Sequence, residues 1–431
     1  MKATLAVGSV LLVLSLTLGL TQKASAAQAA DRSQGVYAAT EVRPAAYDAY
    51  LGDLGHNTAE LSHFGGACDC LACRRNACGS RLFASAEYLQ WWNKGRQLPP
   101  LVTTSPLGTP ATQAGVLDPG GLPSATASIL IGDEAIGSNL QSGARLTFGA
   151  WLDDCESVAV AVRVFGVIGN DESYSLSSDE YPILAVPFIN RDPAVDAEYA
   201  SILGYPNMRN GAADITAGNE VYGGQVFLRY LVDSGPNYRI DMLTGYRYNR
   251  INDDLDMNFH TNTTTTDYYF HDNFKTRNSY NAGEVGLLGE FSCSKWTLST
   301  LGTISFGNMA QRVTIQGENA VTSDDVTVSH QGGVFAQTYS NIGDHERNVA
   351  CWAPEAGVKL SYAMTQKLSM SVGYTFLYWT RMVLAGDQID RNVNASQMSG
   401  GTLVGPAVPE FRFKDTDFWV QTIDIGLNYN Y

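Results

Sequence analysis

The last fifteen residues of the chain, Asp417–Tyr431, read DFWVQTIDIGLNYNY. Apolar side chains take alternate positions along this stretch, and polar or small side chains take most of the positions between them. The apolar set is Trp419, Ile423, Ile425, Leu427, Tyr429 and Tyr431. A period of two is typical of a β-strand that presents two chemically different faces. The end of the chain therefore predicts a strand with one apolar and one polar side.

Nine further stretches alternate in the same way, so the sequence predicts ten strands. These nine are Arg81–Trp92, Ser142–Leu152, Ser157–Ile168, Glu220–Val232, Asn237–Arg250, Ser279–Phe291, Lys295–Asn308, Pro354–Ala363 and Gln366–Arg381. Short and long connections alternate strictly between the strands. The short ones cover 153–156, 233–236, 292–294 and 364–365, and the long ones cover 93–141, 169–219, 251–278, 309–353 and 382–416.

This asymmetry predicts an all-β fold, a transmembrane antiparallel up-and-down β-barrel, because such barrels have short periplasmic turns and long outer loops. Ten strands place both ends of the barrel on the periplasmic side. Twelve strands are the alternative, if part of Gln311–Ser329 pairs with a neighbour. The mean hydropathy of −0.11 excludes a helical transporter.

The polar faces of the expected strands carry twelve charged residues. They are Arg145, Arg163, Arg229, Arg239, Arg247 and Lys359 against Glu87, Asp241, Glu284, Glu290, Glu355 and Asp424. The core of a soluble barrel could not hold these charges, whereas a wet lumen can. We therefore expect the charged side chains to line the lumen and the apolar side chains to face lipid. Ten strands lie close to the number at which side chains fill a barrel, so a narrow ion path and structural ion pairs both stay open.

Aromatic residues occur at both ends of the expected apolar faces. At the outer rim we expect Trp91, Trp92, Tyr174, Tyr378 and Trp379, and at the inner rim Trp151, Tyr238, Trp296, Tyr429 and Tyr431. Two such girdles suit the two interfaces of a bilayer. The aromatic carboxyl terminus also resembles the closing strand of bacterial outer-membrane proteins, which implies outer-membrane lipid and the assembly machinery as partners.

The amino terminus predicts export. Met1–Ala26 combines Lys2, the apolar run Ala3–Leu20 and the small residues Ala24-Ser25-Ala26, which is typical of a cleaved signal peptide. We expect a mobile periplasmic leader over 27–79 and the barrel over 80–431. The net charge of the whole chain is −15, which argues against a nucleic-acid partner. The chain is accordingly expected in the cell outer membrane.

The expected leader contains a dense group of thiols. Cys68, Cys70, Cys73 and Cys78 lie within eleven residues, and Cys155 and Cys293 lie at expected periplasmic turns. Disulfides are favoured in an oxidising compartment. A thiolate metal site is the alternative, although the spacing lacks the paired form of most such sites. Disulfides from the leader to the inner mouth of the barrel are a hypothesis.

Three stretches resemble the beta-barrel porin-7 family of bacterial outer-membrane proteins. They are AEYLQWWNKGRQLPPLVTTSP at 86–106, SGARLTFGAWLDDC at 142–155 and VGYTFLYWTRMVLAGDQIDRNVN at 372–394. The resemblance covers the chain from about residue 80 to its end and implies an outer-membrane barrel. It implies no catalytic, cofactor-binding or substrate residue.

The leading function is a porin-like passive channel for small solutes or a structural membrane component, and the protein is not expected to be an enzyme. The first alternative is a plugged barrel that binds at the cell surface through acidic outer loops. A remote alternative is a surface hydrolase that uses His271-Asp272 and Asp344-His345. The segment 93–106 could fold inward as a constriction with Lys94 and Arg96, but we expect it to cover the barrel top. Close carboxylates at 253–256 could hold calcium, although such groups are common in loops without an ion.

Overall fold

The computed structural model describes residues 82–169 and 171–431. The expected signal peptide, the leader and the four leader cysteines lie outside the described residues. The described part contains no α-helix and two short 3₁₀ segments, η1 (Gly386–Gln388) and η2 (Ala395–Gly400). None of its helical segments is both long and apolar enough to span a bilayer.

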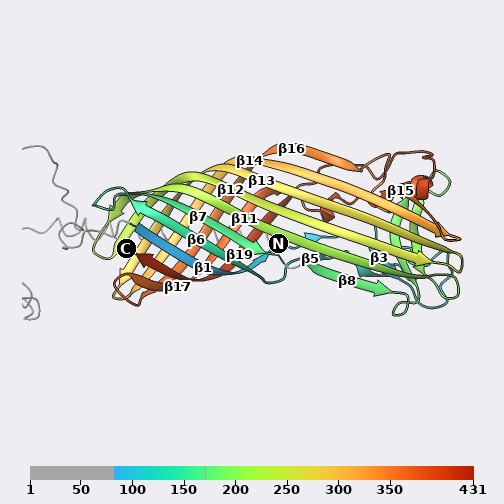
Figure 1. The fold of residues 1–431 in the computed structure, drawn as a ribbon, viewed down its shortest axis with the longest axis horizontal. Coiled ribbons are helices and arrows are strands. Elements are labelled where there is room, and N and C mark those ends of the chain that lie inside the picture. The colour runs from blue at the N-terminus through green and yellow to red at the C-terminus, as the bar shows by residue number, and fades with distance from the viewer. Residues whose placement is uncertain (1–81, 170) are drawn as a thin grey trace, which may run out of the picture. The chain divides into compact units, whose positions relative to one another are not determined.

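Ten strands form a closed antiparallel ring, as the sequence predicted (Figure 1). Each strand pairs with the next one along the chain, and the last closes on the first with Phe83 opposite Asn430. The strands are β1 (Leu82–Asn93), β6 (Gln141–Trp151), β7 (Val158–Ile168), β11 (Asn210–Ser234), β12 (Tyr238–Asn262), β13 (Thr266–Cys293), β14 (Trp296–Ser323), β16 (Gly343–Ala363), β17 (Leu368–Met382) and β19 (Thr416–Asn430). The four short turns are where we expected them.

The ring contains ten strands although its sheet contains twelve. β15 (Val326–Gln331) forms a hairpin with the far end of β14, and β8 (Glu172–Ser177) pairs with β11. Neither strand enters the ring. The twelve-strand barrel is therefore wrong, because 311–323 continues β14 itself and only 326–331 folds back on it.

Four strands run far beyond the length that a bilayer needs. β11 and β12 have 25 residues each, and β13 and β14 have 28 each, whereas about 10 tilted residues cross the hydrocarbon. The expected long loop over 251–278 is wrong: the chain stays extended and turns only at 263–265. Beyond the lipid, water covers the outer face, so the outward side chains become polar and the apolar-outward pattern stops.

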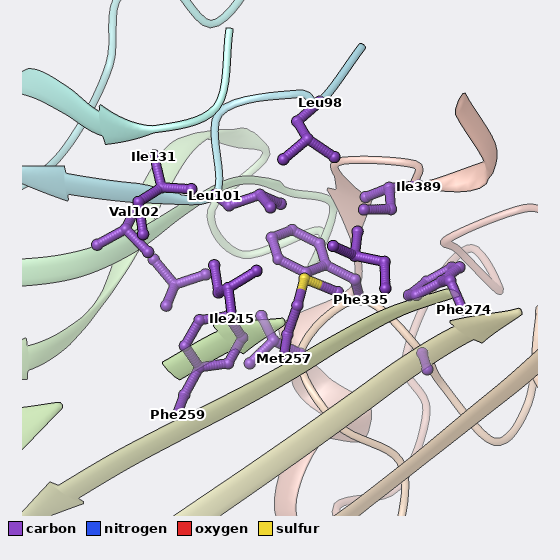
Figure 2. Close-up of a cluster of buried hydrophobic side chains, with 14 of the residues drawn as sticks. Leu98, Leu101, Val102, Ile131, Ile215, Met257, Phe259, Phe274, Phe335 and Ile389 are labelled. Atoms are coloured by element: carbon purple, nitrogen blue, oxygen red, sulfur yellow. The ribbon is translucent and has the colours of Figure 1, made fainter. Parts of the chain in front are cut away.

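The expected loops 169–219 and 309–353 are also partly wrong, because 210–219, 309–323 and 343–353 belong to ring strands, and much of what remains of the expected loops forms a plug. β10 (Ala197–Gly204), β9 (Leu184–Asn190), β3 (Val102–Thr104) and β4 (Ser128–Ile131) make a second sheet, and β18 (Asn392–Val393) joins β9. β2 (Arg96–Gln97) pairs with β5 (Ala135–Ile136). The plug packs its apolar side chains against inward residues of the tall strands, among them Ile215, Met257 and Phe259 (Figure 2). The expectation that 93–106 merely covers the barrel is wrong, because Leu98 and Leu101 are completely buried in this core.

Apolar residues face outward along the part of every ring strand that lies nearest the short turns. Leu228 on β11 and Ile425 on β19 are exposed, whereas the charged residue next to each of them, Arg229 and Asp424, points to the barrel axis. Side chains that face lipid need no polar partner, so this exposed apolar belt marks the membrane-spanning zone.

The aromatic girdles are only partly where we expected them. Trp296, Tyr429 and Tyr431 are exposed in the belt, but Trp91 and Trp379 are buried inside the barrel. Trp151 also packs inside, beneath the guanidinium groups of Arg229 and Arg239. Only one residue of each neighbouring pair, 91–92 and 378–379, can face lipid, because successive side chains of a strand point to opposite faces.

Candidate functional site

The candidate site is the interior of the barrel, which side chains fill in successive layers. The inward positions of β12 display the layers in order. From the inner end they are Arg239 and Asp241, Leu243, Arg247, Asn249, Ile251, Asp253, then Leu255, Met257 and Phe259. All twelve charges that the sequence placed in the lumen lie on the inward faces of the ring strands, in the first two charged layers.

The first charged layer lies at the inner mouth. Arg229 donates to Asp241 at 2.6 Å and also bonds Glu290, while Arg239 contacts Asp241 at 2.8 Å. The carboxylate of Asp241 is fully buried between the two guanidinium groups, whose charges also lie over the indole ring of Trp151. These contacts join β11, β12 and β13 at the ends of the strands that carry the short turns.

The central layer holds the other eight charges. Glu87 bonds both Arg145 and Lys359, and Arg145 reaches Asp424 at 2.9 Å. Arg247 bonds Glu284 and Glu355, and Arg163 lies 3.9 Å from Glu355. The six positive and six negative side chains of the two layers are thus all ion-paired. Several pairs cross the interior instead of joining neighbouring strands, because a barrel of ten strands is narrow enough for side chains to meet.

Small residues make room for this layer. Gly373 on β17 and Gly426 on β19 face inward beside Asp424 and Glu87, and a β-carbon at either position would collide with those side chains. Arg247 is 1 % exposed and Asp424 is 0 % exposed. Side chains that line an open aqueous path remain accessible to water, so the burial of these two indicates a filled centre, whereas the side chains of Arg163 and Lys359 in the same layer are 22 % and 26 % exposed.

Inside the barrel, an apolar layer follows the central charged layer in the direction away from the short turns. It includes Leu89, Trp91, Val167, Val221, Ile251, Tyr280, Met309, Cys351, Ala353, Leu377, Trp379, Leu384, Phe418 and Val420. Trp379 is the largest fully buried side chain of the described residues. Residues from every ring strand except β6 meet here and pack together across the barrel interior.

The plug is held to the wall by a buried ion pair that sequence reasoning only partly found. Arg96 contacts Asp253 at 2.6 Å and donates to the carbonyl oxygens of Gly218 and Asp254. Asp253 also accepts from the backbone N–H of Ala385. The two carboxylates next to it have other partners, since Asp254 bonds Lys275 and Asp256 bonds His271, so the calcium hypothesis finds no shared site among the described residues. The sequence signal for an inward Asp253 was its spacing from Arg247: residues an even number apart on a strand share one face.

A second buried carboxylate anchors the segment 332–342. Asp272 accepts backbone N–H groups from Val334, Phe335 and Ala336 at 2.8–3.1 Å. Burial raises the pKa of Asp272 to about 6 from its ordinary 3.8, although these hydrogen bonds lower it. The carboxylate therefore holds three amides whose apolar side chains enter the outer core, at a cost in desolvation.

We expect this anchor to weaken as the pH rises from 4 to 6. Over that window the folded chain keeps a proton that the unfolded chain releases, so stability falls with rising pH, by up to about 3 kcal/mol. Hydrogen-exchange protection factors of 332–342 should be lower at pH 7 than at pH 5. In Asp272→Asn the pH-dependent difference should vanish, and its persistence would contradict this assignment.

The two His-Asp pairs do not form one cluster in the contacts of the described residues. His271 contacts Asp256 at 2.7 Å on the outer face of the wall, while Asp272 points inward to its backbone partners. His345 stacks on Phe411 with ring centres 3.6 Å apart, and Asp344 accepts from Thr314. Within the described ranges no three His, Cys, Asp or Glu residues are placed to hold a metal ion.

Cys155 lies in the turn between β6 and β7, and Cys293 is exposed at the end of β13. Both are at the end of the barrel with the short turns. Cys351 is buried in the apolar layer. The proposed disulfides to Cys68, Cys70, Cys73 and Cys78 lie outside the described residues.

The ring, its outward apolar belt and its charged interior define an outer-membrane β-barrel. The chain belongs to the family described as Putative beta barrel porin-7, whose model matches residues 83–431. The family places the protein in the outer membrane. No curated protein matches the chain.

Several solved barrels are similar in fold. The outer membrane protease OmpT from Escherichia coli has 8 % identity and a TM-score of 0.39, covering 82 % of this chain and 97 % of its own. The translocator domain of the autotransporter NalP from Neisseria meningitidis has 10 % identity and a TM-score of 0.27, covering 84 % and 92 %. A FadL homologue from Pseudomonas aeruginosa has 10 % identity and a TM-score of 0.20, covering 81 % and 90 %. These likenesses concern the fold alone.

Proposed function

We propose that the protein is a non-conducting, structural outer-membrane barrel that holds a rigid folded head beyond the bilayer. The observation that carries this proposal is the burial of the central charged layer. Arg247 bonds both Glu284 and Glu355 where a passive channel would need water. The apolar layer and the plug add two further barriers along the same axis. Of the functions that the sequence left open, the structural component is thus favoured over the channel.

We expect the purified protein to be silent in planar bilayers. Paired charges in a filled layer offer no continuous hydrated path, so ions meet a desolvation barrier of many kcal/mol. The measurement is single-channel current after verified insertion, with a known porin in the same bilayer as the positive control. Steady, stepwise conductance of the native protein would overturn the proposal and restore the passive channel.

The proposal includes partners and processing. We propose that outer-membrane lipid surrounds the apolar belt and that the assembly machinery binds the closing strand β19 together with Tyr431. We also propose export through a cleaved signal peptide, and no catalytic role. Surface binding through acidic outer groups gains little support, because Asp254, Asp256 and Glu346 are each engaged by a neighbouring side chain.

A further inference from the structure

Three arginines gather on the outward face of the wall just beyond the lipid belt. Arg250 follows Tyr246 and Tyr248 on the outward face of β12. Arg277 on β13 lies directly opposite Arg312 on β14. Arg250 lies opposite Ser279, which is two positions from Arg277 on the same face. Residues related in this diagonal way have side chains about 7–8 Å apart at their bases, within reach of one shared ligand.

Two of these arginines lack a side-chain partner in the part of the chain that the structure describes. Among the described residues, the side chains of Arg250 and Arg277 form no hydrogen bond or ion pair, and Nε of Arg250 is buried without a partner. The carboxylates around them are already engaged. Glu346 bonds Arg312, Asp254 bonds Lys275 at 3.1 Å, and Glu220 accepts from the amide of Asn252.

This arrangement is costly without an anion. Like charges directly opposite each other destabilise a pair of strands, and Glu346 forms an ion pair with Arg312 but not with Arg277. A tetrahedral phosphate placed between guanidinium groups would neutralise them through charge-assisted, bidentate hydrogen bonds. The chain as a whole is acidic, at −15, so the free cations are not part of a generally basic surface.

The height of the cluster identifies the source of the phosphate. Arg250 lies four residues beyond Tyr246, and Arg312 lies six residues beyond Phe306, which is exposed in the belt. At about 3.3 Å per residue and a tilt near 45°, the bases of these side chains lie roughly 9 Å beyond Tyr246 and 14 Å beyond Phe306 along the membrane normal. Arginine side chains reach back several ångströms toward the membrane, so their charged ends come to the level of the headgroups.

We propose that Arg250, Arg277 and Arg312 form a binding site for the phosphate of an anionic lipid in the outer leaflet. Arg250 and Arg277 supply the free guanidinium groups, and Arg312 supplies a third that Glu346 holds in place. The aromatic rings of Tyr246 and Tyr248 below them face the glycerol and acyl region, as interfacial aromatics do. The site would fix one lipid beside the tall wall formed by β12, β13 and β14.

The test compares lipid retention by the full protein and by Arg250→Gln/Arg277→Gln. Both are placed in nanodiscs of phosphatidylglycerol and phosphatidylcholine, and bound lipid is measured by native mass spectrometry after release into detergent. We expect the native protein to retain phosphatidylglycerol in preference to phosphatidylcholine, and the double variant to bind it at least ten-fold more weakly. The matched control is Arg412→Gln, an exposed arginine of the loop before β19 that pairs with Glu410, and it should bind as the native protein does.

Three results would overturn the proposal. The first is equal retention of both lipids by the native protein, and the second is unchanged binding by the double variant. The third is displacement of the lipid by millimolar inorganic phosphate as effectively as by phosphatidylglycerol, which would assign the site to a free anion. Because Arg250 is half-buried, Arg277→Gln alone is the second variant if the double variant fails to fold; it removes an exposed side chain and should weaken binding severalfold.

Discussion

Arg247→Leu is expected to destabilise the barrel by about 3–5 kcal/mol, the cost of leaving buried charges without a partner. Arg247 bonds Glu284 and Glu355, and all three side chains are almost completely buried. Leucine is too short and apolar to replace either contact. A domain is commonly stable by 5–15 kcal/mol, so this single change removes a large share. The measurement is the free energy of unfolding in urea for the barrel folded in detergent micelles.

The stability that a second substitution restores distinguishes the loss of ion pairs from the loss of side-chain packing. Arg247→Leu/Glu284→Gln leaves Glu355 with Arg163 as its remaining cation, so we expect it to regain at least half of the lost stability. Arg412→Leu removes an exposed guanidinium from an ion pair and should change the free energy of unfolding by less than about 1 kcal/mol. If the double variant is no more stable than Arg247→Leu, the loss comes from packing and the ion pairs contribute little.

The ring and its two faces could be predicted from the sequence because lipid and interior impose opposite demands on successive residues. The ends of the strands could not be predicted in the same way. Along β12 the apolar residues other than Leu243 occupy even positions as far as Tyr248 and odd positions from Ile251 to Phe259. The strand continues, but the face that needs apolar side chains changes from the outside to the inside where lipid gives way to water and the plug. The switch of the apolar residues from even to odd positions therefore marks the point where the strand leaves the membrane. We interpreted the residues beyond this switch, 251–278, as a loop.

The candidate site shows a similar limit. Parity along each strand identifies which charges face inward, so the twelve residues could be selected from the sequence. Their partners could not be selected, because contacts such as Lys359 with Glu87 and Arg247 with Glu355 cross the interior between strands that are not neighbours. Whether Asn93–Pro106 enters the barrel also depends on distant residues. The apolar run around Leu98 gains a partner only when the inward side chains of β12 and β13 lie opposite it.

Arg96→Met is expected to detach the first plug segment while leaving the ring closed. Arg96 and Asp253 are each 3 % exposed and lie 2.6 Å apart, and the guanidinium also satisfies two backbone carbonyls of β11 and β12. Removing it leaves Asp253 with only the N–H of Ala385, at a cost of about 3–5 kcal/mol. We expect amide protection over 96–136 to fall by two to three orders of magnitude, whereas protection of β1 and β19 in the membrane zone should persist.

Asp253 provides the internal control for this prediction. Burial raises the pKa of Asp253 and Arg96 lowers it, so in the variant the carboxyl should take up a proton more readily and the plug should be better protected at pH 5 than at pH 8. Arg96→Met/Asp253→Asn carries no buried charge and should recover most of the protection at both pH values. Lys94→Met removes a half-exposed partner of Asp417 on the same segment and should cost less than about 1 kcal/mol. Equal losses in Lys94→Met and Arg96→Met would mean that the segment depends on its backbone and apolar contacts, because the buried ion pair would then contribute no more than an exposed one.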